Sequence, residues 1–121
     1  MATIREVMST ELVAVKPGAT VAEAATVMGT GHVGAALVMD GEHLAGIFTE
    51  RDILRALASD FDAAGHLVSL WMTENPTTLP PGAVAADALD LMLSGGFRHV
   101  PVVDEGRVVG VVSMRDVAPR G

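Results

Sequence analysis

The sequence contains no cysteine, which excludes disulfide bonds and thiolate metal sites. It also contains no tyrosine, one tryptophan and three phenylalanines, so aromatic residues make up only 3% of the chain. Hydrophobic residues nevertheless account for 50%, and the core must therefore consist of Val, Ala, Leu, Ile and Met. Side chains of this small, branched kind suit helices that pack closely against short β-sheets.

Long hydrophobic runs are absent as well. The longest apolar segments, Ala35–Met39 and Val108–Val112, have the length of single strands, whereas a transmembrane helix needs about 20 residues. The segment Met1–Glu6 lacks the basic and then apolar order of a signal peptide. We therefore expect a cytoplasmic protein that makes no contact with a membrane.

Basic residues are scarce, because 8 Lys and Arg face 15 Asp and Glu, for a formal net charge of −7. An acidic surface repels the phosphates of DNA and RNA, so we expect no nucleic acid partner. A small anionic ligand is still compatible with this charge. A helix N-terminus with one or two local basic groups is enough to bind it.

What the sequence does contain is an internal repeat. Pro17–Ala19 matches Pro81–Ala83, and Arg51–Asp52 matches Arg115–Asp116, in both cases with an offset of 64 residues. Identities at the turns and at the ends of both copies indicate a duplication. Because neither copy could bury its helices alone, we expect the two to pack with pseudo-twofold symmetry into one module.

Each copy is predicted to fold as β-α-β-β-α, which makes the fold class α/β. The first copy, residues 1–58, is expected to have a lead-in helix over 3–8, strands over Leu12–Val15, Ala35–Met39 and Leu44–Phe48, and helices over Val21–Thr30 and Thr49–Ala58. Residues 59–65 are expected to form a polar linker. The second copy, residues 66–121, is expected to have a lead-in helix over His66–Met72, strands over Thr77–Leu79, His99–Val103 and Arg107–Val112, and a helix over Val84–Ser94.

Two segments, Gly46–Asp52 and Gly110–Asp116, carry the functional signal. Each is a strand that leads through Gly-x-x-[Ser/Thr]-x-x-Asp into a helix. A purely structural interpretation is a capping box, in which the hydroxyl and the carboxylate bond to each other's backbone N–H groups. The functional interpretation is that the carboxylate accepts both vicinal hydroxyls of a ribose, while the hydroxyl and the first helical amides hold a phosphate. The two roles are compatible.

The doubled order of strand, Pro-Gly, helix, Val-x-x-Asp and Gly-x-x-[Ser/Thr]-x-x-Asp resembles a pair of cystathionine β-synthase (CBS) domains, also called a Bateman module. The resemblance covers about residues 4–117, and Phe97–Asp104 fits the family's second-strand pattern especially well. It implies a stand-alone regulatory module with two pseudo-symmetric sites in a cleft between the repeats. Its ligand would be AMP, ADP, ATP or a relative such as S-adenosylmethionine, NAD(H) or a cyclic dinucleotide, and no other cofactor is required.

The resemblance assigns ligand-binding residues to both sites. The first site would comprise Thr49, Asp52, Ile47 and Thr77, and the second would comprise Ser113, Asp116, Val111 and Val13. Arg98 and His99 occur in the second copy only, at a position that often supplies phosphate ligands in the family, and an Arg there is a forked cationic donor. Arg51 and Arg115 are further candidates; alternatively, they are solvated side chains of the first helical turn.

No enzymatic activity is expected. The four histidines lack the spacing of a metal site, and no His stands at a matching place beside both Thr49 and Ser113 to complete a hydrolytic triad. The alternative to a ligand sensor is a ligand-free dimerisation or interaction module, in which the two motifs only cap helices. By analogy with the family we expect a homodimer that acts through an effector protein, which the sequence does not identify.

Overall fold

The structure is a computed structural model that describes residues 1–118, and in it the chain forms two compact units. The first-repeat unit comprises Val13–Pro76. The second-repeat unit comprises Met1–Leu12 and Thr77–Gly121. Each unit has its own hydrophobic core. Within residues 1–118, no helix has the length and apolar character needed to cross a membrane.

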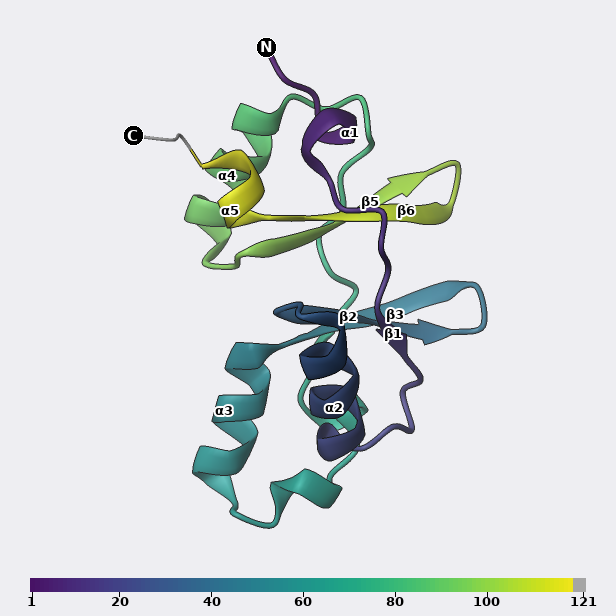
Figure 1. Ribbon diagram of the computed structural model, residues 1–121, viewed down its shortest axis with the longest axis vertical. Coiled ribbons are helices and arrows are strands. Elements are labelled where there is room, and N and C mark those ends of the chain that lie inside the picture. The colour runs from purple at the N-terminus through teal and green to yellow at the C-terminus, as the bar shows by residue number, and fades with distance from the viewer. Residues whose placement is uncertain (119–121) are drawn as a thin grey trace. The chain divides into compact units, whose positions relative to one another are not determined.

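The first-repeat unit is a four-stranded sheet with two helices on one face (Figure 1). Its elements are β1 (Ala14–Val15), α2 (Val21–Gly31), β2 (Ala35–Asp40), β3 (His43–Thr49), α3 (Glu50–Ser59), the 3-10 turns η1 (Ala63–Gly65) and η2 (Val68–Leu70), and β4 (Thr73–Glu74). The strand order is β1-β2-β3-β4, in which β1 and β2 are parallel and the other pairs antiparallel. The core consists of Val21, Ala24, Met28, Ala36, Val38, Phe48, Ala56, Ala63 and Val68.

The second-repeat unit is an antiparallel hairpin with helices on one side (Figure 1). Its elements are α1 (Ile4–Val7), α4 (Ala85–Gly95), β5 (His99–Asp104), β6 (Arg107–Ser113) and α5 (Met114–Val117). The core consists of Ile4, Ala88, Met92, Val100, Val102 and Val112. The hairpins and main helices lie where the sequence predicts them, with ends that differ by one or two residues.

The lead-in segments are exchanged between the repeats. The N-terminal segment packs on the second repeat, where Ile4 N donates to Ala83 O at 2.8 Å. The segment before the second repeat packs on the first, where Val68 N donates to Ala19 O, also at 2.8 Å. The predicted boundaries therefore follow the sequence repeat, whereas the compact units follow this exchange. The predicted lead-in helix over 66–72 is not one helix but contains the single turn η2, which follows η1.

The exchange explains the glycine at the start of each motif. A Cβ atom on Gly46 would lie 2.7 Å from Thr73 O, and one on Gly110 would lie 2.9 Å from Ser9 O. Both distances are shorter than real Cβ contacts, and the sulfur atoms of Met72 and Met8 would lie as close, at 2.7 and 2.6 Å. A flexible Met side chain can move aside, whereas the backbone oxygens cannot do so without a shift of the segment. A side chain at either position would thus push the lead-in segment away from the strand.

The strand predicted over Thr77–Leu79 is wrong, because Leu79 makes only an isolated parallel bridge to Val102. In the first repeat, Leu37 N donates to Val13 O at 2.8 Å and helps to hold β1 on β2. Pro101 occupies the equivalent place in the second repeat and has no N–H to donate. The ladder therefore cannot extend to Thr77.

Candidate functional site

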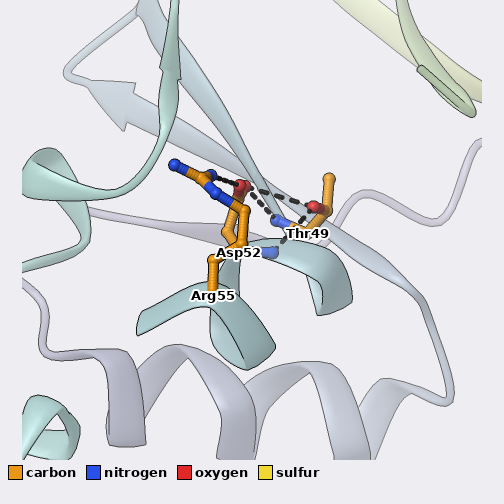
Figure 2. A network of polar contacts seen from close by, with 3 residues as sticks. All are labelled: Thr49, Asp52 and Arg55. Atoms are coloured by element: carbon orange, nitrogen blue, oxygen red, sulfur yellow. Dashed lines mark hydrogen bonds and ion pairs between the residues drawn. The ribbon is translucent and has the colours of Figure 1, made fainter. Parts of the chain in front are cut away.

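The first-repeat motif lies where β3 runs into α3. Asp52 Oδ2 accepts hydrogen bonds from Thr49 N at 2.9 Å and from Thr49 Oγ1 at 3.1 Å, as Figure 2 shows. Asp52 N donates in turn to Thr49 Oγ1 at 3.3 Å. The capping box predicted from the sequence is therefore present, and it fixes the Asp52 carboxylate against the start of α3.

A basic side chain pairs with the second oxygen of the Asp52 carboxylate. Arg55 Nη1 donates to Asp52 Oδ1 at 2.7 Å (Figure 2). The Arg55 side chain is 56% exposed, whereas that of Asp52 is only 7% exposed. The sequence analysis missed Arg55, although its place three residues after Asp52 on one helix is the spacing at which side chains meet.

Arg55 belongs to a longer series of contacts within the first-repeat unit. Its guanidinium carbon lies 5.7 Å from the centroid of the Trp71 ring, within the range of a cation–π contact. Trp71 Nε1 donates to His66 Nδ1 at 3.3 Å, and the two rings are stacked. His66 Nε2 lies 3.3 Å from Asp60 Oδ2. The segment that carries Trp71 is thereby linked to the side chain that pairs with Asp52.

The second-repeat motif has the same cap at the end of β6. Asp116 Oδ2 accepts hydrogen bonds from Ser113 N at 2.8 Å and from Ser113 Oγ at 2.9 Å. Within residues 1–118, no side chain forms an ion pair with Asp116. The position equivalent to Arg55 is Pro119, which lies outside the described residues and carries no charge. Among the described residues, Asp116 is therefore capped like Asp52 but has no cationic partner.

The first amide of each motif helix is already hydrogen-bonded. Glu50 N donates to Gly34 O at 3.0 Å, and Met114 N donates to Arg98 O at 2.8 Å. These two N–H groups are therefore not available to a phosphate, which differs from the expectation that the first amides hold one. The bond to Met114 also places the backbone of Arg98 at the start of α5.

The predicted phosphate ligands are arranged around both motifs. His99 is the cross-strand partner of Ser113, so Arg98 and His99 stand beside the second motif. Arg98 is exposed and His99 is half-buried. Arg51 and Arg115 are exposed on the first turns of α3 and α5. The part that these four residues play in binding stays a prediction.

The residues predicted to flank the base are divided between the units. Ile47 in β3 and Val111 in β6 each precede the hydroxyl residue of their own motif by two positions. Val13 belongs to the first-repeat unit, whereas Thr77 belongs to the second-repeat unit. Each is therefore in the unit opposite to the motif with which the resemblance pairs it, and that pairing stays a prediction.

Both repeats match a known family model, the CBS domain, over residues 4–59 and 64–119. The chain belongs to the CBS-domain family. The resemblance seen in the sequence is thus confirmed, together with the α/β fold of two tandem repeats. CBS-domain proteins are in general regulatory rather than catalytic.

The chain also resembles individual CBS proteins over most of its length. It is 38% identical to an "uncharacterized 17.7 kDa protein in bps2 3'region" of Acidianus ambivalens, and the match covers 95% of this chain and 70% of that protein. Among other curated relatives, this chain spans between 14% and 84% of the relative's length.

Several of the solved CBS-pair structures that this chain resembles contain ligands. The CBS domain protein PAE2072 from Pyrobaculum aerophilum, complexed with AMP, has a TM-score of 0.89 and 29% identity, with 98% of this chain and 92% of that chain covered. The CBS domain pair of protein MJ0100, in complex with 5'-methylthioadenosine and S-adenosyl-L-methionine, has a TM-score of 0.87 and 25% identity, with 97% and 93% covered. The chemical group that these ligands share is adenosine.

Proposed function

We propose that the two Thr/Ser-x-x-Asp motifs bind the adenosine part of a nucleotide and that the protein is a regulatory sensor module. The observation that carries this proposal is the pattern of hydrogen bonds that the Asp116 carboxylate accepts. Ser113 fixes its Oδ2 atom from two donors and leaves Oδ1 without a donor among residues 1–118. The adenosine ligands of PAE2072 and MJ0100 support the same ligand class.

The chemistry of a capped carboxylate suits a ribose. An ionised carboxylate offers about four acceptor positions, and the cap uses two of them. The vicinal hydroxyls of a ribose are two donors, and hydrogen bonds to a charged acceptor are about twice as strong as neutral ones. Because the cap already holds the carboxylate in place, little side-chain entropy is lost when the ligand binds. Capping a helix and binding a ribose are therefore joint roles of one aspartate.

A phosphate would be recognised by local positive charge, since the chain as a whole carries −7. Arg98 is the side chain best suited to this role, because it is exposed and its carbonyl is fixed to the start of α5. A guanidinium binds a phosphate through two parallel hydrogen bonds. We assign His99, Arg115 and Arg51 as further phosphate ligands, and Ile47, Val111, Val13 and Thr77 as residues beside the base.

The function as an interaction module is the second candidate, because the capping boxes are complete without a ligand and helix α3 exposes apolar side chains. Leu54 is 70% exposed and Leu57 43% exposed, and Phe61 beyond the helix is 86% exposed. Apolar side chains of this size mark contacts with other proteins when they gather in a patch. We propose a homodimer and an effector protein as partners. Light scattering that gives the mass of a single chain would contradict the homodimer.

A thermal-shift screen tests the proposed function. The protein is heated with adenosine, AMP, ADP, ATP, 5'-methylthioadenosine or S-adenosylmethionine, and guanosine monophosphate is the control. A ligand at about 100 times its Kd stabilises the folded state by roughly 2.7 kcal/mol. For a domain of this size the Tm should rise by about 8–15 °C. If millimolar adenosine compounds move the Tm no further than guanosine monophosphate does, the interaction module is the better description.

A further inference from the structure

The two aspartates differ in how many acceptor positions they have left. Both use two positions of Oδ2 for the cap. Asp52 uses a third position, on Oδ1, for Arg55 Nη1 at 2.7 Å. Of the roughly four positions of a carboxylate, Asp52 therefore has one left and Asp116 has two, as far as donors among residues 1–118 are concerned. A ribose that donates both vicinal hydroxyls needs two.

We infer that Arg55 determines the ligand selectivity of the first-repeat motif by competing with the ribose for Asp52. This inference rests on the proposed function of the motif. While Arg55 is in place, a ribose can donate only one hydrogen bond to this carboxylate. To donate both, the ligand must displace the guanidinium from an ion pair with a nearly buried partner. An adenosine ligand therefore occupies the Asp116 motif first and the Asp52 motif only at higher concentration.

The surroundings of Arg55 hold it in the competing position. The Trp71 ring lies beside its guanidinium at 5.7 Å, and His66 fixes that ring by a hydrogen bond and by stacking. A guanidinium that is restrained in this way loses less entropy when it pairs with a carboxylate. The second repeat has Val7 and Pro119 at the positions equivalent to Trp71 and Arg55. The second repeat therefore has no counterpart of the Arg55–Trp71 pair at these two positions.

Binding assays with adenosine can isolate this competition. In a protein with Asp116→Ala, only the Asp52 motif retains its carboxylate, and Arg55→Gln is then added. We expect the double variant to bind adenosine about five- to tenfold more tightly than Asp116→Ala alone. An ion pair with one exposed partner contributes up to about 1 kcal/mol, or about fivefold, and the second hydroxyl bond adds to this gain. Arg107→Gln is the matched control, because it removes an exposed Arg from the far end of the β5–β6 hairpin and should change nothing.

Trp71 provides a second readout, since it is the one tryptophan of the sequence. Saturating adenosine should change its fluorescence in the Asp116→Ala protein, because the guanidinium leaves the ring. The Arg55→Gln protein should show little change. A purely structural ion pair would give neither this difference nor tighter binding. Circular dichroism melts establish that each variant is folded.

The outcomes separate the inference from the proposed function. If the wild-type protein binds adenosine but Arg55→Gln leaves the Asp116→Ala protein unchanged or weaker, the inference is overturned and the proposed function stands. The same holds if the double variant shows no binding. If neither the wild-type protein nor any variant binds an adenosine compound, both are overturned.

Discussion

In both units a strand of seven residues ends at a hydroxyl residue that caps the next helix, and the aspartate three positions on bonds back to it. The surroundings of the two caps differ. Helix α3 has ten residues and brings Arg55 to its aspartate, whereas α5 has four residues and brings no basic side chain within the described chain. The second motif instead has Arg98 and His99 beside it. Duplication has thus kept the backbone geometry while the neighbouring side chains have diverged, so the two motifs should differ in affinity.

The two cores provide the largest expected difference. Phe48 is fully buried in the first-repeat core, and Val112 occupies the equivalent position in the second. Phe48→Ala should lower the free energy of unfolding by about 3–5 kcal/mol, because it removes a whole ring and leaves a cavity. Val112→Ala removes fewer atoms and should cost less. Urea denaturation measures both losses. Equal losses of stability would contradict the full burial of the Phe48 ring in the first-repeat core.

Substitution of the motif glycines tests the exchange of the lead-in segments. Gly46→Ala and Gly110→Ala should each destabilise the protein by about 1–3 kcal/mol, since the new Cβ would press on the lead-in backbone. Gly18→Ala is the matched control, because a Cβ there meets no atom within 4 Å. If Gly46→Ala melts at the same temperature as Gly18→Ala, the close approach of the lead-in segment is wrong.

The first helices of the two repeats differ in their caps. Thr20 caps α2 in a capping box with Glu23, whereas Val84 stands at the equivalent position before α4 and makes no side-chain cap bond. Thr20→Val should therefore cost about 1 kcal/mol, and Val84→Thr should stabilise by less than that. Thermal melts measure both changes. A loss of stability from Val84→Thr would show that burial of Val84 outweighs a new cap.

The smallest expected effect concerns the phosphate. Arg98→Ala should weaken ATP binding by up to about fivefold and leave adenosine binding unchanged, because only ATP carries phosphates for the guanidinium. The difference should shrink at high salt, which screens exposed charges. Titration calorimetry at two ionic strengths measures it, with Arg107→Ala as the control. Equal losses for ATP and adenosine would remove Arg98 from the phosphate site.

Much of the fold could be predicted because the sequence encodes it locally. The strand periodicity, the Pro-Gly turns and the Thr49 and Ser113 caps all act within a few residues of the chain. The exchange of the lead-in segments could not be predicted, because it depends on contacts such as that between Ser9 and Gly110 across about 100 residues of sequence. The predicted strand at Thr77 does not form, because Pro101 has no N–H group to donate. This effect of Pro101 is visible only when the pairing partner is known.

The candidate site was predictable to a similar extent. Thr49, Asp52, Ser113 and Asp116 follow from a motif that both repeats share. Arg55 does not, because its counterpart is Pro119 and a comparison of the repeats draws attention away from unmatched positions. The spacing of three residues between Asp52 and Arg55 on one helix is a local signal from which their contact could have been predicted. Differences between the repeats are therefore as informative about the site as their identities.

Asp116→Ala, studied for both stability and AMP binding, tests the central claim most directly. The loss of the cap alone should lower the free energy of unfolding by only about 0.3–1 kcal/mol. The loss of charged hydrogen bonds to a ribose, about 1.5–3 kcal/mol each, should weaken AMP binding by roughly tenfold to more than a hundredfold. Asp52→Ala should affect binding less, because Arg55 already occupies that carboxylate. An Asp116→Ala protein that is less stable yet binds AMP as the wild type does would contradict the account and leave both motifs as helix caps.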